Sequence, residues 1–142
     1  MTDSLLLDTH IVLWLDGGDD RLLPATRALI DRSWRGGGTI LMSAVTAWEI
    51  ALLADAGRIA LDLPVDDWIR RFVDRPGIEA VPLHHLTAAR SYRLPQLEHR
   101  DPADRLLIVT AIEQGCPLVT YDRRIIRFAE RHGREYNFSV VA

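Results

Sequence analysis

Short apolar runs alternate with helix-like segments along the whole chain, and this alternation most strongly limits the possible folds. Strands that alternate with helices are typical of parallel α/β sheets, in which a helix carries the chain from one strand to the next. Continuously apolar runs suit strands that are buried on both faces of such a sheet. The segments expected to form strands are Leu5–Asp8, Thr39–Met42, Ile78–Leu83, Leu118–Tyr121 and, at the edge, Phe138–Val141.

Helix-starting and helix-ending residues define the segments between these strands. Pro24 suits a first helical position, and three glycines after Arg35 end that helix. After Pro64, apolar residues recur at helical spacing, so we expect them to pack in the core or to meet a partner. The length of 142 residues suits one domain, residues 1–142. The other expected helices cover residues 10–15, 44–56, 85–93, 102–114 and 123–131, and the apolar residues after Pro64 are Trp68, Ile69, Phe72 and Val73.

The basic residues exclude two classes of enzyme. All 17 of them are arginine, and the sequence contains no lysine. A Schiff-base enzyme requires a lysine amine, and a Walker-type phosphate loop requires a lysine next to its serine or threonine. The absence of lysine therefore narrows phosphate binding to arginine and a metal ion.

The single cysteine and the N-terminal region indicate the compartment. Cys116 stands alone, which excludes a disulfide framework, and its apolar surroundings predict a core position. Asp8 and His10 interrupt the first apolar stretch, so it does not resemble a signal peptide. No run approaches the roughly 20 apolar residues of a membrane span. We therefore expect a cytoplasmic protein with no membrane association.

Four acidic residues stand where the expected fold brings distant segments together. Asp8 and Asp122 end the first and fourth strands, Glu49 follows the second strand, and Asp104 begins the helix before the fourth. Ligands of open α/β sheets bind outside the carboxyl ends of the strands, where the strand order reverses. Right-handed crossovers place these ends along one edge of the sheet. The four carboxylates are therefore expected to converge.

Such a cluster favours a bound cation, because neighbouring like charges raise one another's pKa. Oxygen ligands suit Mg²⁺ or Mn²⁺, and the sequence shows no cysteine and histidine spacing typical of zinc. A metal ion held by acids can activate a water molecule and stabilise charge on a phosphate group. The pattern thus predicts a metal-dependent reaction at a phosphate.

Each acid also has a purely structural interpretation. Glu49 could complete a capping box with Thr46. Asp101 and Asp122 could each cap the helix that follows them, and Asp104 would interact favourably with the dipole of its helix. The joint placement of the acids, rather than any single one, favours a functional site.

Four segments, taken in order, resemble motifs of the PIN-domain ribonucleases, and among them the VapC-like toxins of type II toxin–antitoxin pairs. The resemblance spans nearly the whole chain and implies a three-layer α/β/α fold with a parallel sheet of about five strands. The segments are Leu7-Asp8-Thr9-His10, residues 43–50 (Ser-Ala-Val-Thr-Ala-Trp-Glu-Ile), residues 99–108 (His-Arg-Asp-Pro-Ala-Asp-Arg-Leu-Leu-Ile) and residues 118–122 (Leu-Val-Thr-Tyr-Asp).

The resemblance also implies an activity and a set of site residues. An endoribonuclease of this family would cleave RNA with Mg²⁺ or Mn²⁺, would be neutralised by a small antitoxin protein, and would form a homodimer. Thr120 and Ser43 would support the metal centre, and Asp101 would be a further ligand or a helix cap. The metal-binding and catalytic carboxylates would be Asp8, Glu49, Asp104 and Asp122.

Arginines near these motifs are candidates for contact with RNA phosphates. They lie directly after Asp122 or beside Asp104, although a solvated helix face would have a similar composition. His10 and His99 lie within the matching segments and could line the site. The arginines in question are Arg100, Arg105, Arg123 and Arg127.

Two other functions are compatible with the sequence. One is a metal-dependent phosphohydrolase acting on a small phosphate ester, but haloacid-dehalogenase-like enzymes usually carry Asp-x-Asp and a lysine, whereas here Asp8 precedes Thr9-His10. The other is a non-catalytic binding module on the PIN fold, since a fold does not fix a function.

Overall fold

The computed structural model describes residues 4–142, so the first three residues of the expected domain lie outside the described part. Its sheet has five strands in the order β3-β2-β1-β4-β5, and every neighbouring pair is parallel. The expected parallel α/β sheet is therefore confirmed. The strands are β1 (Leu5–Leu7), β2 (Ile40–Ser43), β3 (Ile78–Val81), β4 (Leu118–Val119) and β5 (Val140–Val141).

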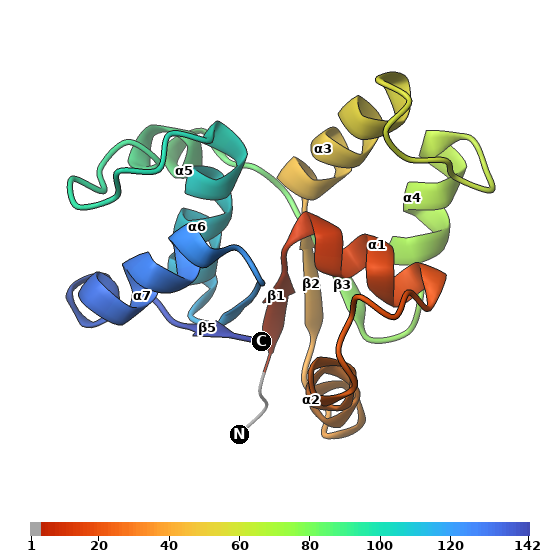
Figure 1. The fold of residues 1–142 in the computed structure, drawn as a ribbon, viewed down its shortest axis with the longest axis horizontal. Coiled ribbons are helices and arrows are strands. Elements are labelled where there is room, and N and C mark those ends of the chain that lie inside the picture. The colour runs from red at the N-terminus through yellow and green to blue at the C-terminus, as the bar shows by residue number, and fades with distance from the viewer. Residues whose placement is uncertain (1–3) are drawn as a thin grey trace.

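Helices cover both faces of this sheet, which gives the expected three layers (Figure 1). Helices α1 to α4 lie on one side of the sheet and α5 to α7 on the other. The helices are α1 (Thr9–Gly17), α2 (Pro24–Arg35), α3 (Ala44–Asp55), α4 (Val65–Val73), α5 (His85–Arg90), α6 (Pro102–Gln114) and α7 (Arg123–Tyr136).

The alternation of side chains along β1 builds a core on each face of the sheet. Leu6 packs with residues of α6 and α7, whereas Leu5 and Leu7 pack with residues of α1 to α4. Trp68 and Phe72 of α4 are buried in the second core, with their rings stacked 5.7 Å apart. This confirms the core position predicted for α4, and Cys116 is likewise buried and free.

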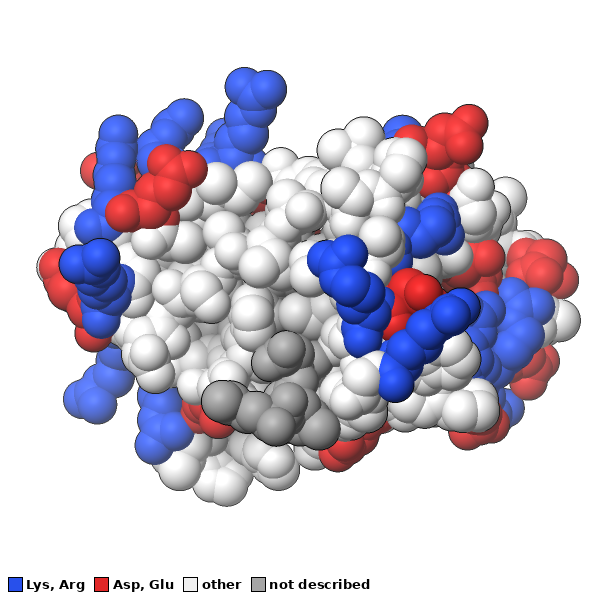
Figure 2. Space-filling model, turned by 90° about the horizontal axis from the view of Figure 1, so that it is seen from below, with Lys and Arg blue, Asp and Glu red and all other residues white. Residues whose placement is uncertain are grey.

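The strand order reverses between β1 and β4, and this switch point positions the functional site. Three strands that are distant in sequence end there side by side: β1 just before Asp8, β2 at Ser43 and β4 just before Thr120. The opposite end of the molecule differs (Figure 2): its centre is largely uncharged, and its arginines and acids lie mainly toward the two sides.

No helix among residues 4–142 is long and apolar enough to cross a membrane.

Candidate metal centre

Asp8 lies at the switch point and is held by donors from two elements. Its backbone N–H donates to the carbonyl of Val119 (3.0 Å), which fixes the end of β1 against β4. Its Oδ1 accepts the N–H of Thr9 (2.7 Å), and its Oδ2 accepts the hydroxyl of Thr120 (2.7 Å). Only 8% of Asp8 is exposed, and this burial raises the pKa of its carboxyl. Asp8 therefore both caps α1 and presents a buried carboxylate.

Glu49 reaches the same place from α3. The hydroxyl of Thr9 donates to Glu49 Oε1 (2.5 Å) and lies 3.3 Å from the hydroxyl oxygen of Thr46. Burial raises the pKa of Glu49, and the charges of Asp8 and Asp101 raise it further. Thr9 thus joins the first motif of the chain to the second.

The capping-box interpretation of Glu49 is wrong, because Thr46 lies inside α3 rather than at its start. The N-cap is Ser43, whose hydroxyl oxygen accepts the N–H of Val45 (3.0 Å). Ser43 therefore starts the helix that carries Glu49, and this capping bond is the role that its side chain has here.

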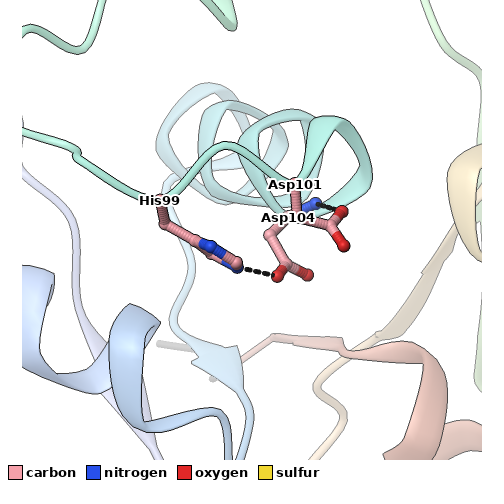
Figure 3. Close-up of side chains that lie close together, drawn as sticks. All are labelled: His99, Asp101 and Asp104. Atoms are coloured by element: carbon pink, nitrogen blue, oxygen red, sulfur yellow. Dashed lines mark hydrogen bonds and ion pairs between the residues drawn. The ribbon is translucent and has the colours of Figure 1, made fainter.

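Asp104 and Asp101 share the first turn of α6 (Figure 3). Asp101 is the N-cap, and its Oδ1 accepts the N–H of Asp104 (3.2 Å), so the capping interpretation of Asp101 is confirmed. Asp104 Oδ2 lies 2.5 Å from Nε2 of His99. Burial and the charges of neighbouring acids, with Asp8 the strongest, raise the pKa of Asp104 to about 7.

Asp122 caps α7 and is tied to Asp8 through one hydroxyl group. Its Oδ1 accepts the N–H groups of Arg124 (2.8 Å) and Ile125 (3.2 Å), as the capping interpretation predicted. Its own N–H donates to the hydroxyl oxygen of Thr120 (3.0 Å), which also bonds Asp8. Thr120 therefore supports two of the predicted acids at once.

The four predicted acids lie close enough at the carboxyl edge of the sheet for their charges to act on one another, whereas the described group whose ligand atoms all lie within 4.8 Å of one another is His99, Asp101 and Asp104. Repulsion is part of what raises the pKa values of three of the four predicted acids: the charge of Asp122 acts on Asp8, that of Asp8 acts on Glu49, and those of Asp8 and Asp122 act on Asp104. A divalent cation would relieve this repulsion and the cost of burying the carboxylates. Four carboxylates form an oxygen donor set that fits Mg²⁺ or Mn²⁺.

Comparison with known proteins identifies the family. Residues 5–131 match the family model of the PIN domain. This chain belongs to the PIN-domain family. It is also 34% identical over 131 residues to Ribonuclease VapC22 of Mycobacterium tuberculosis, and that match covers 92% of this chain and 95% of the relative. The expected membership among VapC-like PIN domains is thus confirmed.

Solved structures share the fold of this PIN domain. VapBC2 from Rickettsia felis, solved with a DNA fragment from its promoter, has a TM-score of 0.65 at 16% identity, covering 97% of both chains. FitAcB from Neisseria gonorrhoeae has a TM-score of 0.61 at 17% identity, covering 97% of this chain and 96% of the other. These likenesses extend over nearly the whole PIN domain.

One predicted RNA contact in this PIN domain does not fit the structure. Arg105 is buried, and its guanidinium donates to the carbonyls of Ser91 (3.0 Å), Leu97 (2.8 Å) and His99 (3.1 Å). Its cation also lies over the ring of Tyr92. Arg105 therefore fastens the loop before α6 instead of facing a nucleic acid.

The other three predicted arginines of the PIN domain are exposed, and two of them line one cleft. This cleft, of about 450 Å³, lies between the loop before α6 and helix α7, with His99 in its wall. Arg100 and Arg127, two of the predicted contacts, line it, whereas Arg123 is exposed at the start of α7. Sequence reasoning missed the two further arginines of the cleft, Arg124 and Arg131.

Sequence reasoning named Thr120 as support for the acids but missed other contacts that orient them. Thr9 was not singled out, although it directly follows Asp8 in the first motif. His99 was expected to line the site, and the structure places it in contact with Asp104 on one side and Arg124 on the other. Its position only five residues before Asp104 could have suggested this contact. His10 is exposed and packs its ring against Trp14.

Proposed function

We propose that this chain is a metal-dependent endoribonuclease whose Asp8, Glu49, Asp104 and Asp122 hold Mg²⁺ or Mn²⁺ and carry the catalytic chemistry. The observation that supports this most directly is the meeting of four acids from four segments at the switch point, with the pKa values of three of them raised. Membership of the PIN-domain family and the likeness to a ribonuclease give further support.

The residues of the chain would orient this centre rather than act as its general base. The N–H of Thr9 and the hydroxyl of Thr120 would hold the two oxygens of Asp8, and the hydroxyl of Thr9 would hold one oxygen of Glu49, so that both carboxylates keep a fixed orientation toward a cation. The bound cation would supply an activated water molecule and offset the negative charge that develops on the phosphate. No nucleophilic side chain is needed in this reaction.

The arginine-lined cleft would bind the RNA backbone. Arg100, Arg124, Arg127 and Arg131 line a cleft whose wall includes His99, which itself contacts Asp104. Arginine binds phosphate groups through two parallel N–H donors. A strand lying in this cleft would place a phosphodiester beside the acid cluster, and Arg123 would extend the basic surface along α7.

We also infer two protein partners. The likeness to a VapC ribonuclease and to the VapBC2 and FitAcB structures supports a small antitoxin that neutralises this chain. A homodimer would cover the exposed apolar surface of α3, where Trp48 and Leu52 lie one helical turn apart and are 59% and 53% exposed. The single buried cysteine agrees with a cytoplasmic location.

The substitutions Asp8→Asn and Asp104→Asn test the proposed activity. Each removes a negative charge at nearly constant shape, so RNA cleavage is expected to fall by more than the roughly 10–100-fold that loss of an outer-shell partner costs. Fluorescent RNA, assayed with Mn²⁺ and with Mg²⁺, gives the rate, and circular dichroism checks the fold.

The control is Asp67→Asn, an exposed acid of α4, which should cleave RNA like the wild type. A generic phosphomonoester should not be hydrolysed, and hydrolysis of it would favour a small-molecule phosphohydrolase. Full RNA cleavage by Asp8→Asn would contradict the proposed centre. A wild type that binds RNA without cleaving it in either metal would instead be a binding module.

A further inference from the structure

We propose that His99 is a positioning residue of the metal centre: it orients the carboxylate of Asp104, and Arg124 in turn fixes its ring. This proposal rests on the proposed function, since it assumes that Asp104 is a metal ligand. It assigns a role to the contact between His99 and Asp104, which neither the sequence motifs nor the comparisons explain.

The hydrogen bonds of the His99 ring define its tautomer, and the one to Asp104 is drawn in Figure 3. The ring nitrogen Nδ1 lies 3.1 Å from a guanidinium nitrogen of Arg124, and Nε2 lies 2.5 Å from Asp104 Oδ2. A guanidinium group can only donate, so Nδ1 must accept. Nε2 therefore carries the proton and donates it to Asp104. A histidine held in this way fixes one carboxylate oxygen and leaves the other for a cation.

The backbone of His99 is fixed as firmly as its ring. The buried guanidinium of Arg105 donates to the carbonyl of His99 and to two other carbonyls of the preceding loop. Only 8% of the His99 side chain is exposed. The imidazole thus has one defined position beside α6, as a group that orients a metal ligand requires.

Direct coordination by His99 is the competing arrangement. Ligand atoms of His99, Asp101 and Asp104 lie within 4.8 Å of one another, which is close enough for a shared ion. Both ring nitrogens of His99 are already used, however: the lone pair of Nδ1 accepts from Arg124, and Nε2 carries the proton given to Asp104. The geometry therefore favours positioning over ligation.

Arg124 connects this histidine to a second acid. Its backbone N–H donates to Asp122, while its side chain donates to His99. The contacts Asp122–Arg124–His99–Asp104 thus run from the start of α7 to the start of α6. These contacts connect Asp122 and Asp104, which no pairing between strands brings together. Arg124 also lines the arginine-lined cleft.

The test compares His99→Ala with His99→Gln, because glutamine retains both a donor and an acceptor. Mn²⁺ affinity of the purified protein is measured by calorimetry at constant pH, and RNA cleavage is measured in parallel. His99→Ala should weaken Mn²⁺ binding about 10–100-fold, as loss of an outer-shell partner does, and His99→Gln should recover most of that loss. His84→Ala, an exposed histidine before α5, should bind Mn²⁺ like the wild type.

Two spectra separate positioning from a merely structural role. Nitrogen NMR of the metal-free wild type should show His99 protonated at Nε2 and unprotonated at Nδ1. Pulsed electron paramagnetic resonance of the Mn²⁺ complex should show no directly coordinated histidine nitrogen. Detection of a coordinated nitrogen, or of the opposite tautomer, would overturn the proposal.

The calorimetry also distinguishes this proposal from the proposed function. Should Asp8→Asn lose Mn²⁺ binding while His99→Ala keeps wild-type affinity, the role of His99 fails and the metal centre stands. Should the wild type bind no Mn²⁺ or Mg²⁺, the metal centre itself fails, and the role of His99 fails with it.

Discussion

The acid cluster has two sides, and they are held by different kinds of donor. On the strand side, Asp8 and Glu49 accept hydrogen bonds from the hydroxyls of Thr120 and Thr9. On the helix side, Asp104 and Asp122 accept them from the imidazole of His99 and from backbone N–H groups at the start of α7.

This difference follows from where each side lies in the fold. Thr120 directly follows β4 and Thr9 lies two residues after the end of β1, so the sheet places both of them, and both are almost fully buried. His99 comes from a loop without regular structure and depends on two arginines, the buried Arg105 and the exposed Arg124. The sheet thus positions the donors of the strand side, whereas a separate network of polar contacts positions those of the helix side.

The largest expected effect on stability comes from removing Arg105, which holds the loop on the helix side. Arg105→Met removes a charged donor from three carbonyls, each bond being worth about 1.5–3 kcal/mol, so the free energy of unfolding should fall by at least about 3 kcal/mol. Urea denaturation measures this loss. Arg100→Met, at an exposed position of the same loop, should change stability by less than about 0.5 kcal/mol. Equal stabilities of the two variants would show that the loop does not depend on Arg105.

Thr120→Val removes a hydroxyl donor from the strand side at almost constant side-chain volume. It leaves one oxygen of the buried Asp8 carboxylate without its hydroxyl donor, and it removes the acceptor for the N–H of Asp122. Stability should fall by about 1–3 kcal/mol and Mn²⁺ affinity by about 10–100-fold. The matched control is Thr110→Val in α6, whose hydroxyl bonds only a helix carbonyl, that of Leu106. That control should lose stability without losing Mn²⁺ affinity, and an equal loss of affinity would contradict the role of Thr120.

The pKa of Asp104 predicts a pH dependence of the metal-free protein. Folding raises this pKa from its ordinary value of 3.8 to about 7, so between these values the folded chain keeps a proton that the unfolded chain has lost. Stability should therefore decrease as pH rises from about 4 to about 7 and then level off. Denaturation in the presence of a chelator at several pH values measures this slope.

Asp104→Asn should reduce this pH dependence, because an amide has no proton to lose, and the part that remains comes from Asp8 and Glu49, whose pKa values are also raised. Mn²⁺ affinity of the wild type should follow the opposite trend and rise toward pH 7, since the cation displaces the same proton. If the metal-free wild type instead gains stability from pH 5 to pH 7, burial does not set the pKa of the Asp104 carboxyl.

The sequence predicted the helices best where both of their ends carry distinct residues. Helices α2 and α6 have the expected bounds, because each has a proline at its first position and glycine after its last. Helix α7 continues five residues past its expected end at Arg131 to Tyr136, where Asn137 adopts a left-handed conformation (φ 54°). Asn137 is a local signal for this end that the sequence prediction did not use, and Phe138 closes the end by donating its N–H to the carbonyl of Gly133 (2.8 Å).

The acids could be predicted because each of them stands beside an element boundary or within a motif, and the sheet topology then brings them together. Several of the contacts that hold them could not, because these contacts join residues far apart in the chain. Thr9 and Glu49 are 40 positions apart, and Arg124 and His99 are 25 apart. Arg105 shows the limit most clearly: an arginine beside an acidic motif suggests a solvent-exposed phosphate contact, yet a loop folded over it buries its charge.

The smallest expected effect concerns the cleft that adjoins the helix side. The double substitution Arg127→Gln with Arg131→Gln removes two charges from its wall. Each phosphate contact contributes about 0.7 to the slope of log affinity against log salt for a single strand, so the slope should fall by about 1.4. Binding of a catalytically inactive Asp8→Asn protein to RNA, measured between low and moderate salt, gives this slope.

The control for this double variant removes the same charge elsewhere. Arg32→Gln with Arg35→Gln changes two exposed arginines of α2, which lies toward the opposite end of the strands from the acid cluster (Figure 1). A local contact predicts a changed slope only for the α7 pair, because exposed charges separated by more than about 10 Å are largely screened at 0.1 M salt. Equal changes of the salt slope for both pairs would mean that RNA binding depends on the net charge of the protein. The cleft beside His99 would then make no specific contribution to binding.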